Sequence, residues 1–163
     1  MVVAMIVGKC RQQQQGMVYL WALFLVFLLG LMLGKGLEVY STLVKREKEA
    51  DLLYIGNLYR QAIYSYYLSS PGYQKKFPEK LTDLLKDPRY LTNRRYLRQL
   101  YRDPMTQQAF TEVMSPEGGI MGVSSSSTKN PIKQGGFTTV NSGFGQAEHY
   151  SDWQFVAQQL VVK

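Results

Sequence analysis

The chain has 163 residues, of which 19 are Lys or Arg and 12 are Asp or Glu, for a formal net charge of +7. This length fits one domain with an additional segment, and the basic surplus suits acidic partners such as anionic lipid or nucleic acid. The one cysteine, Cys10, excludes an internal disulfide framework, and the one histidine, His149, has no spacing to the serine run at 124–127 that suits a catalytic triad. No cluster has the spacing of a zinc or dinucleotide site, so we do not expect an enzyme.

An uncharged run at residues 17–34 is the first strong signal. It contains no Asp, Glu, Lys, Arg, His, Asn or Gln. At about 1.5 Å per residue, a helix of this length spans roughly 27 Å, which is close to the hydrocarbon thickness of a bilayer. We therefore predict a membrane-spanning helix at 17–36. A secretory signal peptide cleaved after the run is disfavoured, because no small-x-small site follows it.

Basic residues flank this run unequally. Two precede it and four follow it within about 15 residues: Lys9 and Arg11 before, and Lys35, Lys45, Arg46 and Lys48 after. By the positive-inside rule, this imbalance weakly favours an amino terminus outside the cytoplasm.

The helical pattern continues beyond the apolar run. Gly30 and Gly34 have the spacing of a GxxxG helix-packing motif, although glycine is also common in membrane helices without that role. After the mixed-charge segment KREKEAD at 45–51, which we expect to be solvated, apolar side chains recur at steps of three and four. They are Ile55, Leu58, Tyr59, Ala62, Ile63, Tyr66 and Tyr67. This stripe predicts one long helix that ends near Ser69, before Pro71-Gly72.

Ten of the twelve tyrosines lie between Tyr40 and Tyr101. One interpretation is an aromatic surface for a ligand or nucleic acid. The other is that the tyrosines at helical spacing belong to the core face of the helix, with their hydroxyls at its wet edge. Their spacing favours the second interpretation.

The stretch 75–102 is basic and punctuated by proline. FPEKLTDLL at 77–85 suits a short helix, and 91–101 suits a second one, with Leu97 and Leu100 turned inward. Four arginines could share a face of the second helix and form a candidate basic patch: Arg94, Arg95, Arg98 and Arg102. The patch could bind nucleic-acid phosphates, but we prefer a solvated face or pairing with acids of a neighbouring subunit.

Short strands are predicted in the last third, at 110–114, 120–124 and 153–156, with a hairpin turn at Glu117-Gly118-Gly119. They would form a small antiparallel sheet on the helix stripe, with Trp153 and Phe155 facing the helix. The segment 124–145 is rich in Ser, Gly, Asn and Thr, and we expect it to be an exposed loop.

The leader and the elements after it together resemble a known family. A short leader with Lys9 and Arg11, then Gly16, then an unbroken apolar helix resembles the prepilin-type signal of type IV pilins and type II secretion pseudopilins. FPEKLTDLL, RDPMTQQAF and the ending YSDWQF are similar to segments that follow the long helix in pseudopilins, so the resemblance covers nearly all of the chain. It implies cleavage by a prepilin peptidase between Gly16 and Met17, N-methylation of Met17 and a cytoplasmic amino terminus.

The resemblance also implies a pilin-like α+β fold, in which a long N-terminal helix packs through its second half against a small antiparallel β-sheet. The implied parts are a leader at 1–16, a transmembrane segment at 17–36 and a periplasmic domain at 37–163. Within that domain we expect a stalk helix to about residue 70, short helices at 79–101, and a small sheet with loops at 108–163. The cleaved chain would carry 17 Lys and Arg against 12 acids, a net charge of +5.

A structural role in the bacterial inner membrane follows from the resemblance. Such a subunit packs against other pilin or pseudopilin subunits through its apolar helix, here with Trp21, Gly30 and Gly34, and the filament supports the export of a secreted protein. Family members usually carry glutamate at the fifth residue after the cut, where this chain has Trp21, and this departure suggests a minor or tip position.

Two further points rest on the family. Some pseudopilins bind calcium before the last strand, where Glu148 and Asp152 are candidate ligands, and we expect no other cofactor. The alternatives to a secretion subunit are a DNA-binding minor pilin and a membrane-anchored periplasmic protein that is never cleaved.

Overall fold

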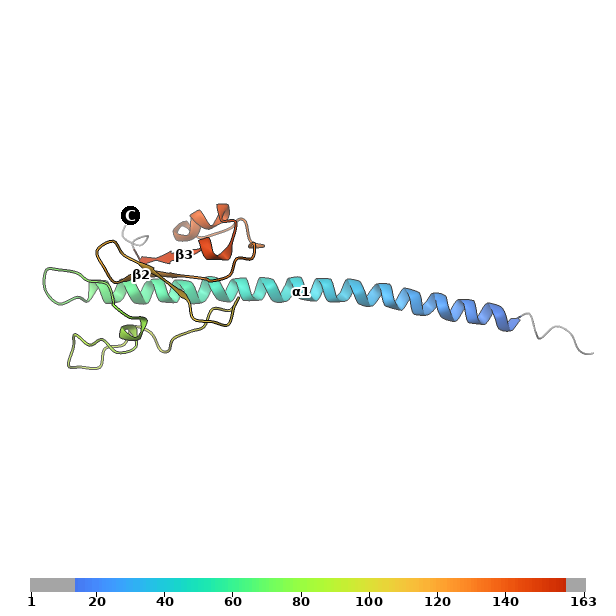
Figure 1. Ribbon diagram of the computed structural model, residues 1–163, viewed down its shortest axis with the longest axis horizontal. Coiled ribbons are helices and arrows are strands. Elements are labelled where there is room, and N and C mark those ends of the chain that lie inside the picture. The colour runs from blue at the N-terminus through green and yellow to red at the C-terminus, as the bar shows by residue number, and fades with distance from the viewer. Residues whose placement is uncertain (1–13, 158–163) are drawn as a thin grey trace, which may run out of the picture. The chain divides into compact units, whose positions relative to one another are not determined.

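The computed structural model describes residues 14–157, with the side chains at 17–32 and 38–157. Helix α1 spans Gln14–Leu68 (Figure 1). The elements after it are the 3-10 helices η1 (Leu81–Leu84), η2 (Thr139–Gln146) and η3 (Tyr150–Asp152), and the strands β1 (Thr111–Met114), β2 (Ile120–Ser124) and β3 (Gln154–Val156). The chain divides after Leu43 into an N-terminal unit and a C-terminal unit. The predicted class, α+β with a long helix and a small antiparallel sheet, is confirmed.

The stripe predicted on the second half of α1 is a buried face in the C-terminal unit. Tyr59, Ala62, Ile63 and Tyr66 are at most 4 % exposed, and Leu52 extends the buried face toward the amino terminus. The other members of the stripe are half-buried: Ile55, Leu58 and Tyr67. The buried tyrosines therefore belong to the core face of the helix, as their spacing indicated.

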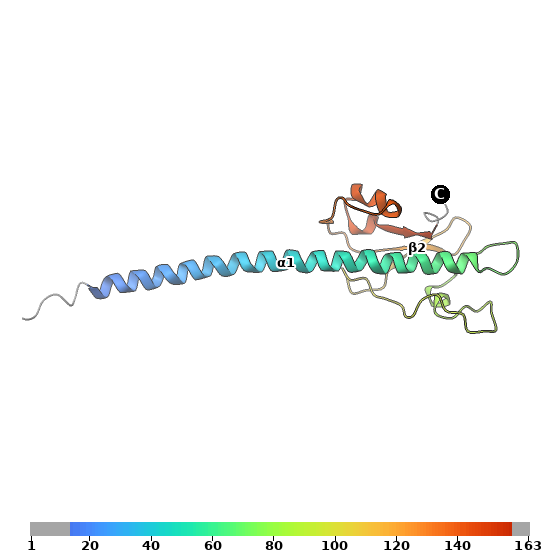
Figure 2. The same ribbon diagram turned by 180° about the vertical axis from the view of Figure 1, so that it is seen from behind.

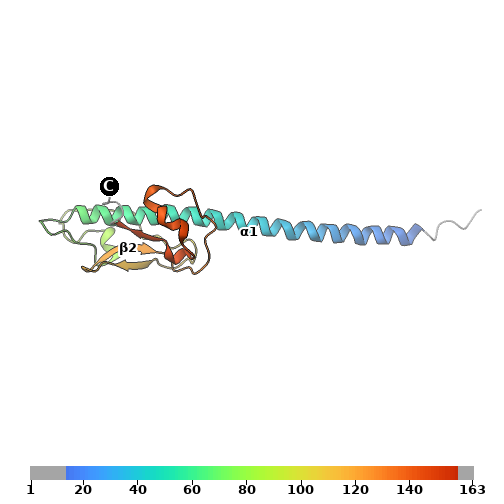
Figure 3. The ribbon, with the colours of Figure 1, turned by 90° about the horizontal axis from the view of Figure 1, so that it is seen from above.

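The three strands form one antiparallel sheet in the order β1-β2-β3 (Figure 3). Their bounds agree with the predicted strands to within one residue at each end. Gly118 and Gly119 form the hairpin turn between β1 and β2 with φ values of 93° and 82°, in the left-handed region where glycine is favoured. The register slips between Val113 and Met114, which interrupts the regular pairing of β1.

β3 lies close to α1 because a glycine stands opposite its central aromatic side chain. Phe155 is fully buried, and a Cβ built on Gly56 would lie only 2.4 Å from its ring. Trp153 is also fully buried, stacked on Phe144 with ring centroids 5.4 Å apart. In Figures 1 and 2, β2 and β3 accordingly run beside the part of α1 that belongs to the C-terminal unit.

The second short helix predicted at 91–101 is wrong, since the backbone there is irregular. Tyr96 and Leu97 both donate their backbone N–H groups to the carbonyl of Leu84, and these distant bonds replace the local bonds of a helix. Leu97 is buried as expected, whereas Leu100 is 42 % exposed. The first predicted helix is a single 3-10 turn, η1.

The prediction that 124–145 is an exposed loop is also wrong in part. Ser124, Ser125 and Ser127 are at most 6 % exposed. Ser125 Oγ donates to the buried carboxylate of Asp103 at 2.7 Å, and such a partner offsets the cost of burying a hydroxyl. Helix η2 occupies the end of the segment and buries Phe144.

Candidate assembly surfaces and buried polar anchors

The N-terminal unit presents apolar side chains on all sides of α1. Every side chain from Met17 to Met32 is exposed, and the large apolar ones range from 41 % exposed at Leu28 to 73 % at Met32. Trp21 is 66 % exposed and makes an edge contact with Phe24, with ring centroids 6.1 Å apart. Within the described part of the chain, no helix is both long and apolar enough to cross a membrane.

The predicted processing and packing positions also lie in this unit. Met17 is 63 % exposed, and a Cβ built on Gly30 would meet nothing within 4 Å, so space for a neighbouring helix remains beside Gly30. The leader up to residue 13, the surroundings of Gly16 and those of Gly34 lie outside what the structure describes.

Glu49 fixes a loop of the C-terminal unit to α1. It is 3 % exposed, and its Oε1 accepts the backbone N–H groups of Ile132 at 3.0 Å and Lys133 at 2.9 Å, and the hydroxyl of Tyr150 at 3.3 Å. Burial, followed by the charge of Glu49, raises the pKa of Tyr150 to about 12. A hollow of about 500 Å³, lined also by Arg46, opens beside the carboxylate.

Arg60 is a second buried polar side chain on the same helix, with 2 % exposure. Its Nη1 donates to Asn57 Oδ1 at 2.9 Å and to Asn141 Oδ1 at 2.6 Å, which ties η2 to α1. The guanidinium carbon lies 5.4 Å from the ring centroid of Phe155. Burial lowers the pKa of Arg60 to about 10, so the side chain stays charged at neutral pH.

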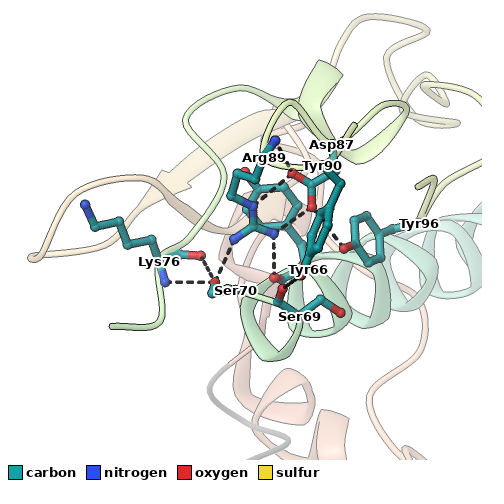
Figure 4. A network of polar contacts seen from close by, with 8 residues as sticks. All are labelled: Tyr66, Ser69, Ser70, Lys76, Asp87, Arg89, Tyr90 and Tyr96. Atoms are coloured by element: carbon teal, nitrogen blue, oxygen red, sulfur yellow. Dashed lines mark hydrogen bonds and ion pairs between the residues drawn. The ribbon is translucent and has the colours of Figure 1, made fainter. Parts of the chain in front are cut away.

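Arg89 joins the end of α1 to two loops (Figure 4). Its Nε and Nη2 donate to the two carboxylate oxygens of Asp87 at 2.9 and 2.8 Å, and Nη2 also donates to the carbonyl of Tyr66 at 3.0 Å. Its Nη1 donates to Ser70 Oγ at 2.7 Å, and the same oxygen accepts the backbone N–H of Lys76 at 3.1 Å. Arg89 also lies over the ring of Tyr66, with its guanidinium carbon 3.6 Å from the centroid.

Asp87 is 1 % exposed and forms the one ion pair found among the described residues. Burial raises its pKa, but hydrogen bonds from Arg89 and Tyr96 outweigh burial, and the pKa is lowered overall. The hydrogen bond to Asp87 in turn raises the pKa of Arg89. Both groups therefore stay charged at neutral pH.

Asp103 holds the turn before β1 to the end of β2. The carboxylate is fully buried, and its oxygens accept the backbone N–H of Met105 at 2.9 Å, the hydroxyl of Thr106 at 2.9 Å and that of Ser125 at 2.7 Å. Ser125, in the serine run that begins at the end of β2, thus has a structural partner in Asp103.

The candidate basic patch does not lie on one helical face, because 91–101 is irregular. All four of its members are exposed: Arg94, Arg95, Arg98 and Arg102. Arg94 lies over the ring of Tyr90, with its guanidinium carbon 4.3 Å from the centroid.

The calcium candidates lie on either side of the start of η3. Asp152 Oδ2 accepts the backbone N–H of His149 at 2.9 Å, and this bond caps the amino-terminal end of η3. Glu148 is exposed. Among the residues described, no group of three or more His, Cys, Asp and Glu side chains could hold a metal ion.

Sequence reasoning missed the buried polar anchors: Glu49, Arg60, Asp87 and Asp103. Glu49 lies one turn before Leu52, so extending the apolar stripe backward would have found it. Asp87 and Asp103 each precede proline, and each accepts the backbone N–H two residues on, which is the pattern of an Asx turn. The Asp-Pro pairs were therefore the available signal for both.

No family model, curated protein sequence or solved structure matches this chain. The function is therefore inferred from the residues and their geometry.

Proposed function

We propose that this chain is a pseudopilin or minor pilin-like subunit of a type II secretion or type IV pilus-type filament, and that it supports protein secretion mechanically. In this proposal a prepilin peptidase cuts between Gly16 and Met17, and Met17 becomes the methylated amino terminus. The amino terminus stays cytoplasmic, α1 anchors the chain in the bacterial inner membrane, and the C-terminal unit lies in the periplasm.

The observation that carries the proposal is the apolar surface on all sides of α1 from Met17 to Met32. A helix that is hydrophobic all round needs apolar surroundings all round. A core helix would be covered by its own chain, and these side chains are exposed. Lipid before assembly, and the helices of neighbouring subunits afterwards, supply such surroundings.

The C-terminal unit suits a part that transmits force without changing shape. Its buried polar groups each join segments that are distant in the sequence: Glu49 holds 132–133, Arg60 holds Asn141, and Asp103 holds Ser125. Buried hydrogen-bonded charges are costly to separate, so they resist local opening. The unit has the helix-and-sheet composition that the family resemblance implies.

The test is to determine the amino-terminal residue of the full chain after extraction from membranes, with and without a co-expressed prepilin peptidase. We expect a peptidase-dependent, N-methylated start at Met17, which Gly16→Glu abolishes. Gly30→Ala is the matched control, because it changes a glycine inside the apolar run and leaves the junction intact. A start at Met1 or Met5 in the presence of the peptidase would overturn the proposal and leave an uncleaved, membrane-anchored protein.

A further inference from the structure

Two loops at the C-terminal end of α1 each carry a fully exposed apolar side chain. Tyr73 has a relative exposure of 107 % and Leu91 of 110 %, so neighbouring residues shield neither of them. The segments 71–76 and 88–95 both lie around the C-terminal end of α1 in Figures 1, 2 and 3. The two loops therefore belong to the same region of the C-terminal unit.

The polar network around Arg89 holds these loops together (Figure 4). Arg89, in the second loop, donates to Ser70 Oγ, and Ser70 accepts the backbone N–H of Lys76 in the first. The hydroxyl of Tyr90 donates to the carbonyl of Ser69 at the end of the helix. These bonds therefore join the loop that carries Tyr73 to the loop that carries Leu91.

The second loop and the residues that flank it also carry a surplus of positive charge. Beside Tyr73, Lys75 and Lys76 line a hollow of about 430 Å³ together with two acids, Glu79 and Glu117. The charge of Arg89 is balanced by Asp87. Four exposed cations that lie close to Leu91 in the sequence have no ion-pair partner within the described part of the chain: Lys86, Arg94, Arg95 and Arg98.

We infer that Tyr73, Leu91 and these four cations form a docking surface for an anionic lipid bilayer. Tyrosine suits the interface between headgroups and acyl chains, because one end of its side chain is apolar and the other is polar. Exposed Lys and Arg side chains add attraction to anionic headgroups. A fluid interface can close around two separate protruding side chains, whereas a rigid protein partner would need two matching pockets.

Two other occupants fit less well. A second copy of this chain carries the same positive surplus and would be repelled. Nucleic acid would pair with the arginines, but its phosphates provide no environment for Leu91. Cleavage at Gly16 and filament assembly play no part in this reasoning, so the inference and the proposed function can fail separately.

The experiment uses the full chain inserted through its apolar run into nanodiscs of phosphatidylcholine, so that the run is occupied before the assay. Capture of phosphatidylglycerol-containing vesicles is compared with capture of pure phosphatidylcholine vesicles. We expect preferential capture of the anionic vesicles. Arg94→Gln with Arg95→Gln should weaken it roughly 30-fold, or about fivefold for each charge removed. Tyr73→Ser with Leu91→Ser should weaken it about tenfold or more.

Two matched controls should change capture by no more than about twofold. Lys45→Gln with Lys129→Gln removes the same net charge from exposed positions elsewhere in the C-terminal unit. Met114→Ser removes a 57 % exposed apolar side chain from β1.

Three results would overturn the inference. The first is equal capture of both kinds of vesicle, and the second is undiminished capture by the Tyr73→Ser, Leu91→Ser variant. The third is binding of a short DNA duplex, at the same salt, that needs the arginines but not Tyr73 and Leu91, which would assign the surface to nucleic-acid phosphates. If the chain does not enter nanodiscs, the proposed membrane anchor is refuted and the docking surface is not. Co-flotation of the chain and its variants with the same two kinds of vesicle then tests the docking surface.

Discussion

Replacing Glu49 with alanine should destabilise the C-terminal unit more than any other single carboxylate truncation on α1. Hydrogen bonds to a charged acceptor contribute about 1.5–3 kcal/mol each, and Glu49 accepts two from the backbone at 3.0 and 2.9 Å. Ile132 and Lys133 are half-buried, so water can replace part of what is lost. We therefore expect the free energy of unfolding to fall by about 3 kcal/mol. Glu49→Gln keeps an oxygen acceptor and should cost only about 1 kcal/mol.

The assay is urea unfolding of the full chain in detergent, monitored by the near-ultraviolet circular dichroism of the buried Trp153 and Phe144. Amide hydrogen exchange at 131–133 is measured alongside it. Glu47→Ala is the matched control, because Glu47 is exposed and lies two residues away on the same helix. It should change the free energy of unfolding by less than about 0.5 kcal/mol. If Glu49→Ala costs no more than Glu47→Ala, the anchoring role of Glu49 is refuted. If Glu49→Gln costs as much as Glu49→Ala, the charge matters and not the placement of the oxygen.

Gly56→Ala should lower the free energy of unfolding by about 1–2 kcal/mol in the same urea assay, because overpacking against Phe155 outweighs the roughly 1 kcal/mol gain in helix propensity. Gly143→Ala, where a Cβ would meet nothing within 4 Å, is its control, and equal effects of the two changes would contradict the clash at Gly56. The pKa of Tyr150 is raised from 10.0 to about 12, so the folded chain holds this proton more tightly, and stability should fall as the pH rises through this window. Thermal melts of Tyr150→Phe should show a shallower decline over that window, and an unchanged slope would contradict the raised pKa.

Local signals predicted most of the helix and the sheet. The stripe from Ile55 to Tyr67 repeats at helical spacing, Pro71 cannot continue a helix, and the Gly118-Gly119 turn separates two strands of matching length. Each of these signals is contained within a few neighbouring residues, and the long helix and the two strands that they predicted are present in the structure. The helix and the sheet were therefore accessible to sequence reasoning.

The two segments that were predicted wrongly owe their conformation to hydrogen bonds with residues distant in the sequence. The segment 91–101 has a leucine spacing that suits a helix, but Tyr96 and Leu97 bond instead to the carbonyl of Leu84. The serine run at 124–127 has the composition of a loop, but Ser125 is buried and donates a hydrogen bond to Asp103, which is distant in the sequence. Both errors arise where a partner outside the local window determines the conformation.

The residue at position 21 decides where in a filament the proposed subunit could stand. After cleavage, the amino group of Met17 would be a positive charge among apolar helices, and such a charge is costly unless a partner neutralises it. In the pilins and pseudopilins that this chain resembles, that partner is a glutamate of the neighbouring subunit, and this chain has Trp21 at that position. One copy therefore cannot neutralise the amino terminus of the next, which favours a position at a filament end.

Trp21→Glu should then let copies of this chain follow one another. Two differently tagged copies, co-expressed with the peptidase, should co-purify more strongly as the variant than as the wild type. Leu25→Glu is the matched control: it places a carboxylate one turn later, at a position that is also exposed, and so out of reach of the amino group that needs it. If Leu25→Glu raises co-purification as much as Trp21→Glu does, any acid in the apolar run suffices. If neither variant changes it, the identity of residue 21 does not select the neighbour, and a position at the filament end loses its physical basis.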